Sequence, residues 1–138
     1  MATSGSADRV LLDTCIWIDY FRKRSGIYEE VGQLIDSGRV CCSKLILAEL
    51  IQGARSEKEI EVIKDLTRVF PAIEESPDSW ERAGTLSFQL RKSGKSIGLS
   101  DCYIATLAMQ NGVSVYTRDE HFAEIESELG VALLHPQP

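Results

Sequence analysis

The stretch VLLDTCIWIDYFR, residues 10–22, carries the pattern that decides the fold. It opens with a short apolar run at positions 10–12, typical of a buried strand, and the run ends at Asp13. Apolar side chains then recur at Ile16 and Tyr20, the spacing of one helix face. The stretch therefore predicts a strand, a carboxylate and a helix, in that order.

The same pattern recurs along the chain. An apolar run at 40–42 precedes a predicted helix over 44–54, and a predicted strand over 113–116 ends in Thr117-Arg118-Asp119. Further helices are predicted over 28–37, 76–93 and 99–110, a short edge strand over 69–73 and a last strand over 131–134. Strands that alternate with helices predict one α/β domain with a central, mostly parallel sheet of about four to five strands flanked by helices.

Length and composition agree with one ordinary globular domain. The chain has 138 residues, 43% of them hydrophobic and 26% charged, and a single domain of roughly 150 residues is common. The polar residues 1–8 predict a flexible leader, which leaves residues 9–138 for the domain. Since no apolar run approaches the roughly 18 to 20 residues of a membrane span, we expect no membrane contact and a cytoplasmic location.

The charge and the cysteines exclude two classes of site. A net charge of −6 argues against a broadly basic surface for nucleic acid. The chain has two histidines and no CxxC pair, so the spacing of a structural zinc site is missing. We therefore expect the four cysteines to be small buried hydrophobic residues; they are Cys15, Cys41, Cys42 and Cys102.

Two carboxylates follow predicted strands directly. Asp13 comes after the first strand, and Asp119 follows the strand over 113–116. Ligands of parallel α/β sheets bind beyond the carboxyl ends of the strands, so both residues belong where a site is expected. Each also precedes a helix, where Asp is a favoured N-cap, and the sequence leaves this structural role open for both.

Two further acids lie within predicted helices. Asp101 continues the small apolar face of the helix over 99–110 and should point inward, where a carboxylate needs a partner such as a metal cation; Ser100 is the better-placed N-cap. Glu49 lies roughly 130° from the apolar stripe of its helix, so a solvated side chain is its simpler interpretation. Gly53, one turn later, indicates close approach by another group. Together, the four acids suit a hard divalent cation.

Four segments in register resemble a known family. They are LLDT at 11–14, AELIQGA at 48–54, LSDCYIATLA at 99–108 and VYTRDEHF at 115–122. The chain resembles the PIN domain family, specifically the VapC-type ribonuclease toxins of prokaryotic toxin–antitoxin pairs. The resemblance implies a PIN-like domain in which Asp13, Glu49, Asp101 and Asp119 surround Mg²⁺ or Mn²⁺. Asp13 and Asp101 match the usual metal ligands, and Asp119 completes the metal shell.

The resemblance also implies an activity. The chain is expected to be a metal-dependent endoribonuclease that leaves 5′-phosphate and 3′-hydroxyl ends. Glu49 would orient or deprotonate the attacking water, and the hydroxyl of Thr117 would orient a water or a phosphate oxygen. Basic residues are candidates for holding the RNA backbone; they are Arg22, Lys23, Arg24, Lys44, Arg91, Lys92, Lys95 and Arg118.

The implied partners are a second copy of the chain and an antitoxin. The resemblance predicts a homodimer and a cognate VapB-type antitoxin that covers the acidic cleft, with operator DNA contacted only through the antitoxin. Apolar residues of the first helices form a candidate docking site, although Trp17 fits a core position equally well. These residues are Ile16, Trp17, Tyr20, Phe21 and Tyr28.

Two other interpretations compete with a nuclease. An aspartyl-phosphate enzyme would use Asp13 as a nucleophile, but a dehalogenase-like phosphatase needs a second Asp where this chain has Cys15, and a receiver domain needs paired acids after its first strand. A catalytically inactive PIN-like binding module is the alternative from another class. The substitution Asp101→Asn separates that module from the enzyme, because only the enzyme loses metal-dependent RNA cleavage.

Overall fold

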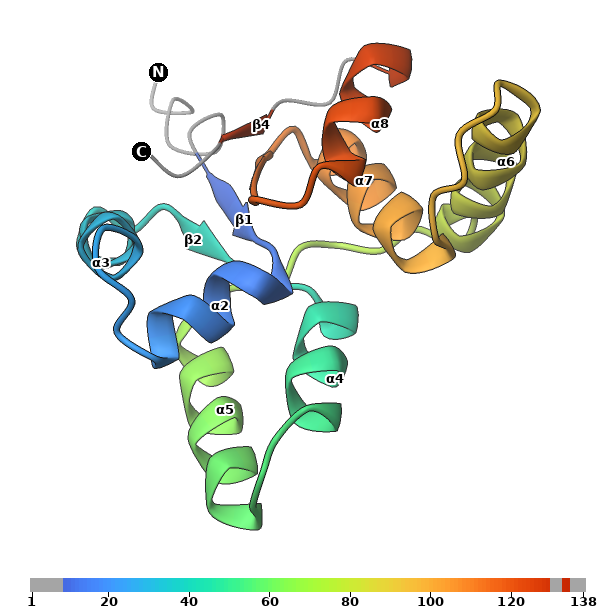
Figure 1. The fold of residues 1–138 in the computed structure, drawn as a ribbon. Coiled ribbons are helices and arrows are strands. Elements are labelled where there is room, and N and C mark those ends of the chain that lie inside the picture. Colours follow the sequence, from blue (N-terminus) through green and yellow to red (C-terminus); the bar gives the residue numbers. More distant parts are fainter. Residues whose placement is uncertain (1–8, 130–132, 135–138) are drawn as a thin grey trace, which may run out of the picture.

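A parallel sheet centred on β1 (Val10–Leu12) organises the computed structural model, which describes residues 9–129 and 133–134 (Figure 1). Within these residues the strand order is β2-β1-β3-β4, with β2 at Val40–Cys41, β3 at Ser114–Tyr116 and β4 at Leu133–Leu134. Every pairing is parallel. The predicted α/β sheet is confirmed; the predicted leader at 1–8 and residues 131–132 of the last predicted strand lie outside the described residues.

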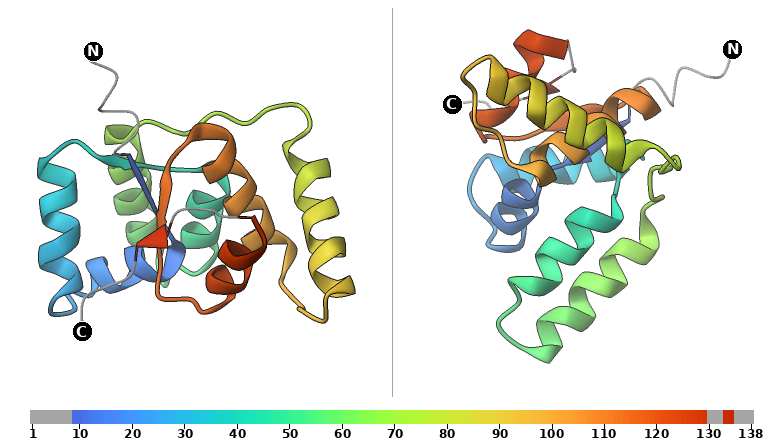
Figure 2. Two further views of the ribbon diagram at one scale, coloured as in Figure 1. Left: turned by 90° about the horizontal axis from the view of Figure 1, so that it is seen from above. Right: turned by 90° about the vertical axis from the view of Figure 1, so that its right-hand side faces the viewer.

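Helices connect the strands and cover the sheet. Their bounds are α2 Thr14–Phe21, α3 Ile27–Asp36, α4 Lys44–Gln52, α5 Glu57–Val69, α6 Ser79–Lys92, α7 Leu99–Asn111 and α8 His121–Leu129. The helix α7 lies between the sheet and α6, whereas α4 and α5 form a hairpin that projects away from the sheet (Figures 1 and 2). In the described part of the chain, no helix is both apolar enough and long enough to cross a bilayer.

The helix α7 is buried in the core of the domain. Its seven consecutive residues from Cys102 to Ala108 are all buried, as expected for a helix enclosed on every side. On the opposite side of β1, Trp17 of α2 is 1% exposed and packs against Phe21 and Phe70. Trp17 and Ile16 are therefore core residues, and the predicted docking role is wrong for both.

Two predicted elements differ in extent. The helix predicted over 76–93 begins only at Ser79, after Asp78, because the hydroxyl of Ser76 bonds the side chains of Asp78 and Ser79 and caps no helix. The edge strand predicted over 69–73 shrinks to one bridge between Ala72 and Cys42. Pro71 has no N–H to extend a ladder, so this segment adds a single contact to the edge of the sheet.

The strand order predicts a ligand-binding crevice at the carboxyl edge of the sheet. From the central β1, the chain crosses to β2 on one side, while β3 pairs on the other, so the order reverses between β1 and β3. Ligands of open α/β sheets bind outside the carboxyl ends of the strands at such a point. Asp13 directly follows β1, and Thr117 directly follows β3.

Candidate metal centre and active site

Asp13 links the end of β1 to the start of α2. Its side chain is 7% exposed; Oδ1 accepts the N–H of Thr14 at 2.9 Å, and Oδ2 accepts the hydroxyl of Thr117 at 2.8 Å. Asp13 is the N-cap of α2, so the structural role proposed from sequence is confirmed. The cap also fixes the carboxylate at the sheet edge, which is the geometry that a metal ligand needs.

Thr117 forms hydrogen bonds with two of the acidic residues. The residue is fully buried, and its hydroxyl donates to Asp13 while it accepts the backbone N–H of Asp119 at 2.9 Å. Both hydrogen bonds of this buried hydroxyl hold neighbouring parts of the site, and its predicted contact with a water or a phosphate oxygen stays a prediction.

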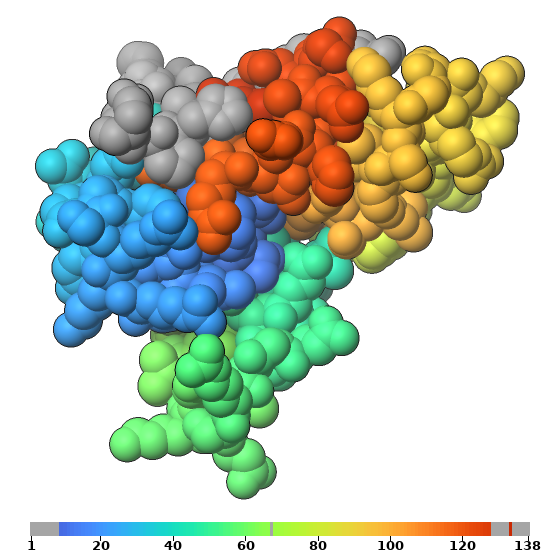
Figure 3. All heavy atoms as spheres, in the orientation of Figure 1, coloured from blue at the N-terminus to red at the C-terminus, as the bar shows by residue number. Residues whose placement is uncertain are grey.

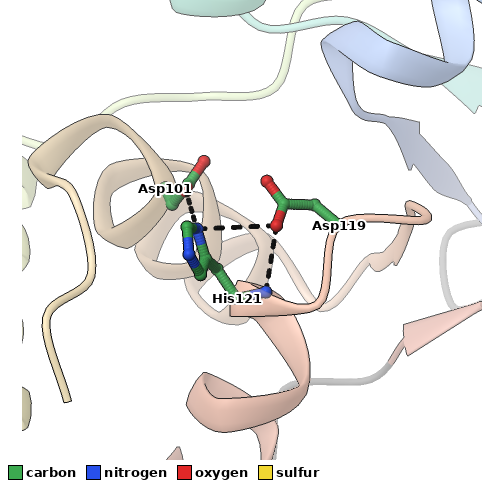
Figure 4. A group of neighbouring side chains, drawn as sticks. All are labelled: Asp101, Asp119 and His121. Carbon is green, nitrogen blue, oxygen red and sulfur yellow. Dashed lines mark hydrogen bonds and ion pairs between the residues drawn. The ribbon is translucent and has the colours of Figure 1, made fainter.

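Asp101 and Asp119 converge with a histidine (Figure 4). The Nδ1 atom of His121 lies 3.5 Å from Oδ2 of Asp101 and 3.5 Å from Oδ1 of Asp119. One potential ligand atom from each residue lies within 4.8 Å of the others. The backbone N–H of His121 also donates to Oδ1 of Asp119 at 3.0 Å, which caps the start of α8 and orients this carboxylate.

Asp101 stands in the first turn of α7. The helix is preceded by Gly98, with no side-chain cap, so the N-cap role predicted for Ser100 is wrong. Unbonded N–H groups at a helix start favour a negative charge, and they make this turn a suitable position for a carboxylate. The side chain of Asp101 is 24% exposed, so it points inward but remains within reach of the crevice.

The acids repel one another. Burial, followed by the nearby charges of Asp119 and Asp13, raises the pKa of Asp101 to about 6 against the opposing effect of His121. Burial likewise raises the pKa of Asp13, opposed by the hydrogen bonds from Thr117, Thr14 and Cys15 and increased by the charge of Asp119. The three aspartates therefore lie close enough to interact, and a cation between them would relieve the repulsion.

Glu49 joins the cluster through a hydrogen bond rather than through a shared ligand position. Its Oε1 accepts the hydroxyl of Thr14 at 2.6 Å, so the residue after Asp13 holds the glutamate at the crevice. The side chain is half-buried, so it is less exposed than the simple solvated interpretation suggests. Gly53 is simply the C-cap of α4: an added Cβ would meet only backbone oxygens at ordinary contact distances, so no other group approaches it.

Sequence reasoning missed three residues that the fold brings to the site. His121 was considered only as a zinc ligand, although its place two residues after Asp119 is a usable signal. Thr14 carries no pattern of its own. Cys15 is half-buried, with its thiol 3.6 Å from Oδ2 of Asp13, while the other three cysteines are buried as predicted.

A cavity of about 360 Å³ opens beside Glu49, between α2, α4 and α5. Apolar residues dominate its wall, and Arg22 and Arg55 are the basic residues that border it. Phe21, part of the predicted docking site, is also in the wall. The other members of that predicted site, Tyr20 and Tyr28, stack on each other with ring centroids 5.2 Å apart and do not line this cavity.

Comparison with known proteins assigns the chain to one family. The PIN domain model matches residues 10–128. Ribonuclease VapC2 of Haemophilus influenzae is 31% identical over 110 residues, which cover 76% of this chain and 82% of that protein. The chain therefore belongs to the PIN domain family, and within it to the VapC ribonucleases, as the four sequence segments predicted.

Solved structures agree with this assignment. VapBC-1 from nontypeable Haemophilus influenzae superposes with a TM-score of 0.74 at 26% identity and covers 91% of this chain and 96% of the other. DNA-bound VapBC from Salmonella typhimurium superposes with a TM-score of 0.73, also at 26% identity, and covers 92% and 97%. Both are similar over nearly the whole fold described above.

Proposed function

We propose that this chain is a metal-dependent endoribonuclease toxin that hydrolyses RNA phosphodiester bonds and is inhibited by a cognate VapB-type antitoxin. The observation that carries the proposal is the convergence of Asp13, Asp101 and Asp119 at the point where the strand order reverses, in a chain of the PIN family. Because the substrate is cellular RNA, the proposal places the chain in the cytoplasm.

The donor set fits a hard divalent cation. Mg²⁺ and Mn²⁺ take carboxylate oxygens, and the mutual repulsion of these acids supports a site that lacks positive charge when it is empty. Asp13, Asp101 and Asp119 would hold the ion. When bound, it supplies a Lewis acid that offsets the negative charge developing on the phosphoryl oxygens.

The chain supplies the remaining parts of the reaction. Glu49, oriented by the hydroxyl of Thr14, accepts a proton from the attacking water, and hydrolysis leaves 5′-phosphate and 3′-hydroxyl ends. Thr117 keeps Asp13 and Asp119 in fixed relation, so neither carboxylate has to be ordered when substrate arrives.

The experiment is cleavage of an RNA pool by the purified chain, freed of antitoxin, in Mg²⁺, Mn²⁺ and EDTA, with cleavage sites mapped at nucleotide resolution. Cleavage that requires the ion and is lost in Asp101→Asn supports the proposal. A wild-type chain that binds its antitoxin but cleaves no RNA in either metal is instead an inactive binding module.

The antitoxin is proposed to dock in the cavity beside Glu49, where an apolar segment would cover the acids. Val62 of α5 lines this cavity and is 52% exposed, whereas Val69, at the end of the same helix, is 73% exposed and is not among the lining residues. Val62→Glu should weaken antitoxin binding at least about tenfold, because it introduces a charge into an apolar contact. Val69→Glu is the matched control, and titration calorimetry with the adjacent small gene product measures both.

Two assembly states belong to the proposal. The chain is expected to form a homodimer, and operator DNA is expected to be bound only by the complex with antitoxin. Light scattering of the chain with and without antitoxin tests the dimer. Gel shift with promoter DNA tests the second expectation, which is contradicted if the chain alone shifts the DNA.

A further inference from the structure

Two arginines form ion pairs with one buried carboxylate next to the candidate metal centre. Asp19 of α2 is 4% exposed, and Arg118 donates to both of its oxygens, from Nε to Oδ2 at 2.7 Å and from Nη2 to Oδ1 at 3.3 Å. Arg24 donates from Nη1 to the same Oδ1 at 3.5 Å. Two guanidinium groups thus share one carboxylate, and the cluster keeps an excess of one positive charge.

The excess charge lies at the rim of the site. Arg118 stands between Thr117 and Asp119, in the loop after β3 that packs against α2 (Figure 3). Its side chain is 46% exposed, and its charge interacts with that of Asp119. Within the described residues Nη1 of Arg118 forms no hydrogen bond, so this group remains available to a ligand.

The fork of hydrogen bonds to Asp19 fixes the guanidinium plane. A free arginine side chain loses rotamer entropy when it is ordered, and a two-point contact with a buried carboxylate supplies that order before any ligand binds. Planar guanidinium groups recognise phosphate through paired N–H donors. A preoriented, half-exposed arginine beside an acidic cluster therefore suits a phosphodiester strand.

We propose that Arg118, held in place by Asp19, binds a phosphate of the RNA strand next to the scissile bond. This inference rests on the proposed ribonuclease function and names one of its substrate contacts. It also explains how a chain of net charge −6 holds a polyanion near three aspartates: the rim carries a fixed cation. Arg118 is the binding residue, and Asp19 is a positioning residue that acts through it.

The test measures binding of a fluorescent single-stranded RNA to the Asp101→Asn chain, which does not cleave, over a series of salt concentrations. Adding Arg118→Met should weaken binding several-fold and reduce the slope of log Kobs against log salt by about 0.7, the value for one phosphate of a single strand. The control is Arg82→Met. Arg82 is also paired with an aspartate, Asp78, but it lies near the opposite end of α7 from Asp101.

The role of Asp19 is tested by a double-mutant cycle. Asp19→Asn should weaken RNA binding because Arg118 is no longer held, but it should have no further effect once Arg118 is methionine. The double variant also leaves no unpaired carboxylate at this position, so it provides a folded protein if Arg118→Met alone unfolds. If the pair of Arg118 and Asp19 has only a structural role, these substitutions should lower the melting temperature and leave the salt slope of RNA binding unchanged.

Three results would overturn the inference: an unchanged slope in the folded Arg118→Met variants, an equal loss in Arg82→Met, or additive effects in the cycle. These failures are separable from failure of the proposed function. If the wild-type chain cleaves RNA but Arg118→Met leaves the salt slope of RNA binding unchanged, only the proposed arginine contact is rejected. A wild-type chain that neither binds nor cleaves RNA rejects the ribonuclease itself, and the inference with it.

Discussion

Asp13 and Asp19 are both buried and belong to the same short helix, yet their surroundings are opposite. Asp13, at the N-cap of α2, faces other carboxylates, and burial raises its pKa. Burial alone would also raise the pKa of Asp19, but the hydrogen bonds and charges of Arg118 and Arg24 outweigh it and hold that pKa below its usual value. Burial by itself therefore does not distinguish a functional acid from a structural one.

The partners of each acid make the difference. The carboxylate of Asp13 belongs to a group of acids whose mutual repulsion a bound cation would relieve, which is the property of a metal centre. The carboxylate of Asp19 already has two cations and organises the loop beside that centre. If this comparison holds, substitutions in the acidic cluster around Asp13 should affect RNA cleavage. Substitutions in the ion pairs of Asp19 should affect stability and substrate binding.

The largest effect is expected at the metal centre. Asp101→Asn should lower RNA cleavage more than about 100-fold, since even groups behind the ligands typically cost 10-fold to 100-fold when removed. The isosteric amide should leave the fold intact, which circular dichroism checks. Metal affinity, measured by calorimetry, should fall together with activity; full activity in this variant would contradict the assignment.

Asp19→Asn is expected to cost stability. Removing one partner of a fully buried ion pair costs about 3 to 5 kcal/mol, but both arginines keep contact with solvent, so we expect about 1 to 3 kcal/mol here. Denaturant unfolding measures it. The surface pair of Arg68 and Asp65 provides a control: Asp65→Asn should change the free energy of unfolding by less than about 1 kcal/mol.

A smaller effect is expected at His121. His121→Asn removes the imidazole beside Asp101 and Asp119 and should change Mn²⁺ affinity by about 10-fold, as a partner of the ligating carboxylates would. Calorimetric titration with Mn²⁺ measures the change. His135→Asn, at the only other histidine of the chain, tests for a general effect of losing an imidazole. Equal changes in the two variants would argue against a role for His121 in the cluster.

A further effect is expected in the pH dependence of the metal-free protein. The folded-state pKa of Asp101, about 6, lies above the unfolded value near 4, so the folded state binds the proton more tightly. The contribution of Asp101 to stability should therefore be greatest below pH 4, fall as the pH rises through about 6, and level off above it. Melting temperatures in EDTA measure this fall, which should be reduced in Asp101→Asn. A rise in stability between pH 4 and 6 that occurs in the wild type but not in Asp101→Asn would contradict the raised pKa of Asp101.

Much of the fold could be predicted from local patterns. The apolar runs that end at Asp13 and at Thr117 locate β1 and β3, and the helical spacing after Asp13 locates α2, because periodicity reports which side chains are buried together. Errors arose at the helix ends: α6 begins at Ser79 and not at position 76 as predicted, and Ser100 does not cap α7. Such ends depend on which hydrogen bonds the folded chain offers, and a sequence does not show them.

The site was predictable only in part. Asp13, Asp101 and Asp119 were predicted as metal-site residues from strand ends and one helix face, and the structure brings these three together. Asp19 carried no pattern, because an aspartate in a helix of mixed polarity resembles any surface acid. Its role depends on Arg118, which is 99 residues further along the chain.

The sequence by itself determined the α/β class, the family and the acids at the strand ends, because these depend on local burial patterns and on short motifs. Only the tertiary structure decided which acids face one another and which face arginines. That distinction depends on contacts between residues far apart in the chain, and it is set by the parallel pairing of β1 with β3 at the centre of the sheet. The same helix thus carries one carboxylate that needs a cation and another that already has two.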